Sequence, residues 1–167
     1  MMPVYENLLK LNYRPYIRAD SHDPSIFAAL PKIIGYALPT SYLDFLTAFP
    51  NTGMFELENG AYIKGLEKLS GNHNYLYGLD MLFAGCSDKD YDLVERAAKR
   101  PYYDGAFPDY VLEIRDNSGG DAFCMDLRPS TLGAIYYWDH ENSSNERHGL
   151  YLVARDFESF VNELQTD

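Results

Sequence analysis

The sequence contains little cysteine, few basic residues and no long hydrophobic segment. Its two cysteines, Cys86 and Cys124, lie far apart and outside any C-x-x-C or Cys-His arrangement. The chain therefore lacks the pattern of a zinc knuckle or a dithiol redox motif, and two buried thiols are favoured over the one disulfide that is formally possible. No segment reaches the roughly 18 consecutive apolar residues that cross a bilayer. The N-terminal residues also lack the pattern of a secretory signal, so we expect a cytoplasmic protein.

Negative charge dominates the sequence. Lys and Arg together number 14 and Asp and Glu 25, which gives a formal net charge of −11. Binding to nucleic acid or to an anionic membrane requires clustered Lys and Arg, so we expect neither partner. A basic protein, in contrast, would be attracted over distances of about a Debye length.

The composition is that of a globular protein. The 167 residues are 46% hydrophobic and 23% charged, which excludes a disordered tail or a collagen-like fibre. A chain of this length buries enough apolar surface to fold without a metal or a disulfide. We expect a single domain over residues 1–167 and no cofactor.

The N-terminal half reads mainly as short helices. Residues 1–20 are interrupted by prolines and are predicted to form an irregular or loosely helical lead-in. Asp23 and Pro24 have the pattern of a helix cap and first helical position, and Pro31 and Gly35 keep that helix short.

A clearer helix follows at residues 41–49. Its apolar stripe has the spacing i, i+3, i+4, i+7 and is formed by Tyr42, Phe45, Leu46 and Phe49. Ser41 and Asp44 have the spacing of a capping box, and Pro50 ends the helix.

The remaining elements are mostly strands. Residues 54–58 and 61–64 flank an Asn-Gly pair and predict a tight hairpin. Further strands are expected at residues 110–115, 122–127, 134–141 and 150–154, with helices at residues 88–100 and 157–164. A short helix at residues 66–69 and a strand at residues 75–79 are also expected. Helices, then antiparallel strands, then a helix indicate one α+β domain.

Three motifs in this order resemble those of the SMI1/KNR4 (SUKH) superfamily. They are the helix motif L-P-x-x-Y-x-x-F-L at residues 38–46, the turn and strand G-G-D-x-F-C-x-D at residues 119–126, and the string IYYWDHE at residues 135–141, which the helix motif F-x-x-F at residues 157–160 follows. The resemblance implies an α+β fold in which helices back a twisted antiparallel sheet. Bacterial members of the superfamily are mostly immunity proteins that bind and neutralise a toxin, and a fungal member is an interaction hub in cell-wall signalling. Neither role requires catalysis, so the resemblance implies no catalytic residue and no metal.

The string Asp139-His140-Glu141 is the most site-like pattern in the chain. With Asp121 it suggests a metal-dependent hydrolase. On a regular strand, however, Asp139 and Glu141 would point to one face and His140 to the other, so they could not converge on one ion unless a bulge intervened. We therefore favour a structural role in which these polar groups brace a neighbouring loop.

The helix predicted at residues 88–100 carries an acidic stripe. Asp88, Asp92 and Glu95 fall at i, i+4 and i+7, opposite an apolar stripe, and this face is either a solvated surface or a docking site. The adjoining loop adds tyrosines, which are favoured at interface cores. The candidate partner-binding residues are Asp88, Asp92, Glu95, Tyr102, Tyr103, Asp104 and Asp109.

Three functions follow from these observations. The leading hypothesis is an immunity protein that inhibits a basic toxin, such as a nuclease, by stoichiometric binding. The second is a scaffold or signalling module that resembles SMI1, and the third is the hydrolase.

Overall fold

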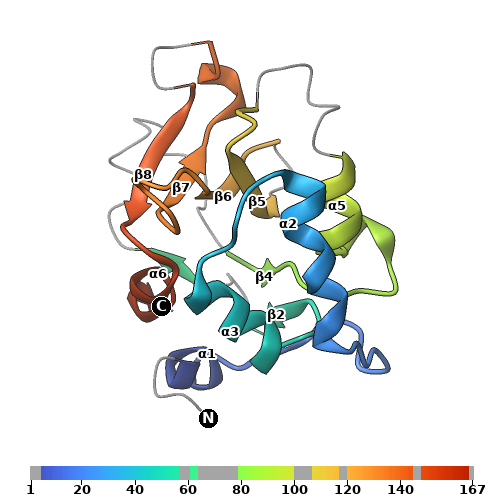
Figure 1. The fold of residues 1–167 in the computed structure, drawn as a ribbon. Helices are drawn as coiled ribbons and strands as arrows, with labels where there is room; N and C mark the ends of the chain where they lie inside the picture. The colour runs from blue at the N-terminus through green and yellow to red at the C-terminus, as the bar shows by residue number, and fades with distance from the viewer. Residues whose placement is uncertain are drawn as a thin grey trace.

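The computed structural model describes residues 5–56, 61–63, 79–99, 107–116, 120–144 and 148–165. Within them the chain forms an α+β fold of antiparallel sheets packed against helices, as predicted (Figure 1). The turn at Asn59-Gly60, the helix at residues 66–69 and most of the strand at residues 75–79 lie outside this described part.

A four-stranded antiparallel sheet dominates the second half of the chain. Its order β5-β6-β7-β8 follows the sequence, because each strand pairs with the next one along the chain. The strands are β5 (Val111–Asp116), β6 (Ala122–Asp126), β7 (Ile135–Trp138) and β8 (Leu150–Ala154). All four strand predictions are confirmed, although β7 ends at Trp138, three residues earlier than expected.

Two smaller sheets join segments that are distant in sequence. Strand β2 (Gly53–Phe55) lies between β1 (Tyr13–Pro15) and β4 (Met81–Leu82). Strand β3 (Tyr62–Ile63) instead pairs with β9 (Leu164–Gln165) near the C-terminus. Most of the predicted hairpin between residues 54–58 and 61–64 falls on residues outside the described part of the chain, and the described residues of β2 and β3 pair with strands distant in sequence, which local turn patterns do not reveal.

The lead-in at residues 1–20 is also more ordered than predicted. It contains helix α1 (Glu6–Lys10) and strand β1, and it buries Tyr5, Leu8 and Tyr13. A Cβ on Gly53 would overlap the Tyr13 ring, so glycine at this position lets the ring lie against β2. This segment belongs to the core because its apolar side chains fill space between the small sheet and the helices.

The helices of the first half largely follow their sequence signals. Asp23 caps the 3-10 helix η2 (Pro24–Ala29) by accepting a 2.8 Å hydrogen bond from the Ser25 N–H, as predicted. Pro31, expected to stop this helix, instead stands in the first turn of α2 (Leu30–Ile34), which ends at the left-handed Gly35. Proline is well tolerated in the first turn because its missing N–H has no helical partner there.

Helix α3 (Thr40–Ala48) carries the predicted apolar stripe, with Tyr42, Phe45 and Leu46 buried. Its N-cap, however, is Pro39, and no side chain caps the helix, so the capping box of Ser41 and Asp44 is not formed.

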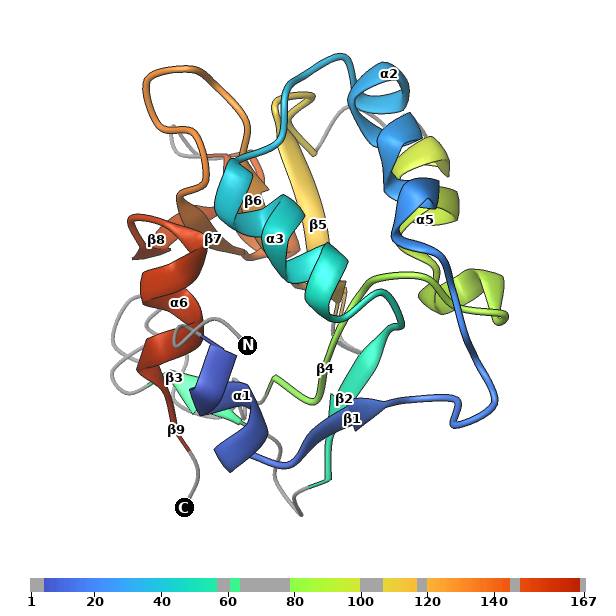
Figure 2. The same cartoon turned by 60° about the horizontal axis from the view of Figure 1, so that its bottom comes forward.

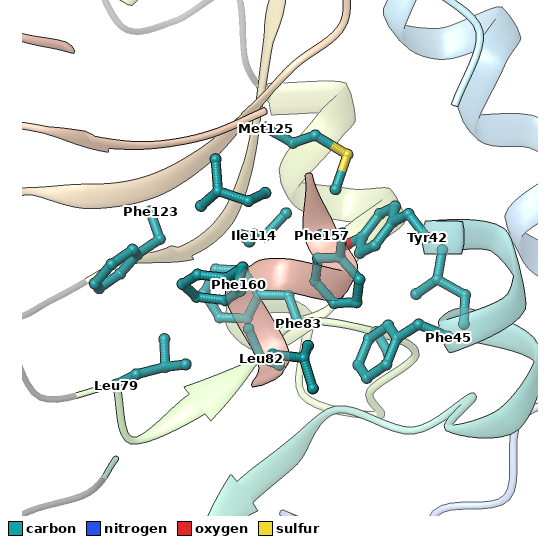
Figure 3. Close-up of a cluster of buried hydrophobic side chains, with 14 of the residues drawn as sticks. Tyr42, Phe45, Leu79, Leu82, Phe83, Ile114, Phe123, Met125, Phe157 and Phe160 are labelled. Carbon is teal, nitrogen blue, oxygen red and sulfur yellow. The ribbon is translucent and has the colours of Figure 1, made fainter. Parts of the chain in front are cut away.

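The main core lies between the four-stranded sheet and helices α3 and α6 (Phe157–Glu163) (Figures 2 and 3). Phe157 meets Phe45 at a ring-centroid distance of 4.9 Å, and Phe160 meets Phe123 at 5.7 Å. These contacts join the two apolar helical stripes identified in the sequence to the inner face of the sheet. Aromatic packing of this kind contributes about 0.5–1.5 kcal/mol per pair beyond area burial.

A second apolar cluster covers the other face of the sheet. Trp138 packs edge-on against Phe107 at 4.9 Å and donates a 3.1 Å hydrogen bond from its indole N–H to the His148 carbonyl. Cys124 is buried in this cluster, and Cys86 is buried elsewhere; both are free thiols, as predicted. No helix in the described part of the chain is long and apolar enough to cross a membrane.

Candidate functional site

The acidic segment at residues 88–100 is two short helices rather than one. The 3-10 helix η3 (Lys89–Tyr91) is capped by Asp88, whose carboxylate accepts from the Asp90 N–H at 3.1 Å. Asp92 then precedes α5 (Leu93–Lys99), and its carboxylate accepts from the N–H groups of Glu95, at 2.9 Å, and Cys86, at 3.0 Å. Each carboxylate satisfies backbone donors at a helix start, as N-cap residues do.

The predicted acidic stripe is therefore wrong in one member. Asp92 is buried, at 8% exposure, and both of its carboxylate oxygens are occupied by backbone donors. Sequence spacing missed this because it assumed one continuous helix from residue 88. A break at Asp92 turns the carboxylate inward.

The other acidic residues of this segment do face solvent. Asp88 and Asp109 are exposed, and Glu95 is half exposed. Lys89 lies 3.9 Å from the Glu95 carboxylate, so the segment also carries positive charge. Tyr102, Tyr103 and Asp104 lie outside the described residues. Of the candidate residues, Asp88, Glu95 and Asp109 therefore lie at least partly at the surface.

Beneath this surface a network of charged side chains fixes α5 to the sheet. The Arg96 guanidinium donates to both oxygens of Glu113, at 3.1 and 2.9 Å, and to Asp116 at 2.8 Å. Arg115 continues the network to Asp116 and, at 2.6 Å, to Asp80. Two-point Arg–carboxylate pairs have fixed geometry, so α5 is held rigidly. Nothing in the residue pattern indicates this network beyond an arginine in a predicted helix.

The Phe83 ring lies beneath the two arginine side chains of this network. The guanidinium carbons of Arg96 and Arg115 lie 4.5 and 5.7 Å from its ring centroid. Cations over an aromatic face are stabilised by the ring quadrupole. The buried ring therefore helps to hold two like charges close together.

A second polar cluster lies where β6 begins and β7 ends. The Asp121 carboxylate accepts from the Tyr137 hydroxyl at 2.6 Å and from the His140 backbone N–H at 3.1 Å, and it meets His140 Nδ1 at 2.8 Å. Burial alone would raise the pKa of Asp121, but the hydrogen bonds from Tyr137 and His140 outweigh it and lower that pKa. Asp121 thus braces the segment after β7, in agreement with the structural role predicted for this string.

The strand argument used for this string does not hold, however. Because β7 ends at Trp138, Asp139 and His140 do not alternate across a sheet. Asp139 caps the 3-10 helix η5 (His140–Asn142) by accepting from the Glu141 N–H at 3.0 Å. As a result, one potential metal-ligand atom from each of Asp121, Asp139 and His140, a carboxylate oxygen or an imidazole nitrogen, lies within 4.8 Å of the others.

This trio has the residue types and spacing of a cation site. Oxygen and imidazole ligands suit zinc or other first-row transition ions. The same carboxylates already accept hydrogen bonds from the protein. These three residues can therefore brace the loop without a bound cation.

A third anchored carboxylate is Asp126 at the end of β6. It is fully buried and accepts from the Arg128 backbone N–H at 2.9 Å, the Arg128 guanidinium at 2.6 Å and the Thr131 hydroxyl at 2.8 Å. Burial would raise the pKa of Asp126, but these donors outweigh it and lower that pKa. The residue fixes the connection between β6 and β7.

Comparison with known proteins gives the context of these clusters. The model of the SMI1 / KNR4 family (SUKH-1) matches residues 23–163, well over half of the chain. The chain belongs to the SMI1/KNR4 family. A curated relative is the SPbeta prophage-derived uncharacterized protein YokK of Bacillus subtilis (strain 168), which is 30% identical over 139 residues, covering 77% of this chain and 67% of the relative. No solved structure shows a significant match.

The family match includes all three motifs from which the resemblance was inferred. It also covers α5, the Arg96 network and the two anchored carboxylates Asp121 and Asp126. Helix α1 and strand β1 lie before residue 23 and are outside it. The SMI1/KNR4 family is not known for enzymatic activity.

Proposed function

We propose that this SMI1/KNR4 protein is an immunity protein that binds a cognate toxin with a basic surface and neutralises it without catalysis. The observation that carries the proposal is the family match over residues 23–163. The net charge of −11 supports it, because an acidic inhibitor is steered toward a basic enzyme. The protein would act in the cytoplasm of the cell that it protects.

The proposed docking surface is the segment around α5. It comprises the exposed carboxylates Asp88, Glu95 and Asp109, together with Tyr102, Tyr103 and Asp104, and excludes the inward-facing Asp92. The ion pairs of Arg96 support this choice because they hold the helix in place before any partner arrives. A preorganised surface loses less entropy on binding.

Protection of cells tests the proposal. If a toxin gene adjoins the gene of this protein, its product would be expressed with and without this protein, and the complex would be isolated by affinity purification. We expect cells to survive only with the protein present and the two chains to purify together. No protection and no complex would overturn the immunity role.

Matched variants test the surface itself. The double variant Asp88→Asn and Glu95→Gln removes two exposed charges, and Asn retains capping ability at position 88. The control Glu158→Gln and Glu163→Gln removes two exposed charges from α6. We expect the first pair to slow association about tenfold and to flatten its salt dependence, and the control to change neither. Equal effects of both pairs would place the docking surface elsewhere.

A further inference from the structure

A pocket of about 270 Å³ lies between the N-terminal segment and the end of α3. Figure 2 shows β1 beside β2, the strand that follows α3. Most of the wall is apolar, and the lining residues are Leu9, Tyr13, Arg14, Pro15, Ala48, Phe49, Pro50 and Asn51. Sites for small organic ligands are usually about 300–1,000 Å³, so this volume suits a group the size of one side chain.

The polar side chains of the lining, Asn51 and Arg14, both present hydrogen-bond donors. Asn51 Oδ1 accepts from the backbone N–H of His22 at 3.0 Å and lies 3.0 Å from His22 Nδ1. Because a backbone N–H can only donate, it fixes which atom of the amide is oxygen. The Asn51 NH₂ group donates to no other described residue.

Arg14 adds positive charge at the same pocket. Its guanidinium is 3.2 Å from Glu56, and its side chain is half exposed. Arg18 lies 3.8 Å from the other oxygen of the same carboxylate. Two guanidinium groups against one carboxylate leave a local positive charge on a protein whose net charge is −11.

From these observations we propose that the pocket binds the C-terminal residue of another protein chain, with an apolar side chain inserted and its α-carboxylate at Arg14 and Asn51. A carboxylate matches two donors and a positive charge, and in a C-terminal residue it is one bond from the carbon that bears the side chain. A free amino acid fits less well because its ammonium group would face the same donors.

Exposed apolar surface beside the pocket supports a chain rather than a small acid. Leu9, which lines the pocket, is 43% exposed, and Tyr16, next to the lining residue Pro15, is 36% exposed. The residues that precede a bound C-terminus would lie on these side chains. Half of the lining comes from residues before position 23, outside the family match, so the inference goes beyond the proposed function and does not depend on it.

Titration by ¹⁵N NMR tests this site with defined probes. The first probe is the tetrapeptide Gly-Ser-Gly-Phe, acetylated at its N-terminus and free at its C-terminus, and its controls are the C-terminally amidated peptide and N-acetylphenylalanine. We expect saturable shifts of the Asn51 side-chain NH₂ and the Leu9 amide with the free acid peptide. The amidated peptide should bind about tenfold more weakly or worse. Equal binding of acid and amide, or no saturable shift, would overturn the proposal, and N-acetylphenylalanine binding as tightly as the peptide would overturn the choice of a chain end.

Variants localise the binding. Asn51→Asp keeps the acceptor for His22 and removes the NH₂ donor, and Arg14→Gln removes the positive charge. Each variant should bind the peptide with the free C-terminal carboxylate about tenfold more weakly. Leu9→Gln changes an exposed wall residue and tests the pocket if Asn51→Asp does not fold. The matched control is Arg155→Gln, which removes an exposed arginine that neither lines the pocket nor pairs with Glu56, and it should change affinity less than about threefold. Equal loss in the control would reduce the effect to general electrostatics and contradict the site.

Discussion

Arg96 and Glu113 form a two-point ion pair that joins helix α5 to strand β5. The bonds measure 3.1 Å from Nε and 2.9 Å from Nη2, and the side chains of Arg96 and Glu113 are only 15% and 9% exposed. Breaking one side of a buried pair leaves an uncompensated charge, which is far more costly than losing an exposed pair. This pair therefore determines how firmly the proposed docking segment is held.

Removing the arginine should destabilise the protein strongly. We predict that Arg96→Met lowers the free energy of unfolding by about 3–5 kcal/mol, because the buried Glu113 carboxylate loses its two-point contact with the guanidinium. Replacing Glu113 with Leu in the same chain should recover much of that loss. Urea denaturation measures both, with Lys99→Met as the control, since its pair with Asp90 at 3.9 Å is exposed and contributes at most about 1 kcal/mol. A loss no larger than that of the control would show that the pair does not fix α5.

Asp126 should contribute to the acid sensitivity of the fold. Its pKa is lowered in the folded state, so its stabilisation is complete above the unfolded value of about 3.9 and is lost as pH falls through the lower folded value. We predict that Asp126→Asn is less stable at neutral pH by about 2–3 kcal/mol. The variant should also lose less stability than the wild type on acidification below about pH 4. Urea denaturation across this range checks both effects, and parallel pH profiles for the two proteins would contradict the assignment.

Gly53 should be intolerant of a side chain. A Cβ at this position would overlap the buried Tyr13 ring, so we predict that Gly53→Ala costs about 1–3 kcal/mol. Because the cause is one specific contact, the double variant with Tyr13→Leu should be less destabilised than the sum of the two single variants. Additive costs in thermal denaturation would mean that the N-terminal strand is not packed against β2.

The cluster of Asp121, Asp139 and His140 is predicted to act as a loop brace. We expect His140→Ala to lower the unfolding temperature by removing the contact with Asp121, and zinc in large excess to leave that temperature unchanged in the wild type. A ligand that binds the folded state raises its stability by mass action. A zinc-dependent rise that disappears in His140→Ala would identify a metal site and revive the hydrolase hypothesis.

Local patterns predicted the elements whose partners are close in sequence. The sequence predicted the apolar stripes of α3 and α6 and the order of strands β5 to β8, because helical periodicity and short turns are local properties. The β1-β2-β4 sheet could not be predicted, because Tyr13 pairs with Phe55 and Gly53 pairs with Leu82, residues that are far apart in the sequence.

The candidate site was predicted less completely, for a related reason. Asp88 and Asp109 are exposed and Glu95 is half exposed, but a helix break turned Asp92 inward, and the early end of β7 brought Asp139 and His140 toward Asp121. Both errors came from treating a predicted helix or strand as regular over its whole length, whereas the helix breaks at Asp92 and β7 ends at Trp138. The Arg96–Glu113 pair and the pocket beside Asn51 depend on tertiary contacts, so spacing alone could not indicate them.

Titration of the toxin with this protein tests the central claim, that the SMI1/KNR4 chain neutralises by binding. The activity of the toxin encoded by the neighbouring gene would be measured against increasing amounts of the protein. If it acts as a stoichiometric inhibitor, activity falls linearly and vanishes at an equimolar ratio. Complete loss at a small fraction of that ratio would mean that the protein inactivates the toxin catalytically, and undiminished activity in excess protein would mean that it is not the inhibitor.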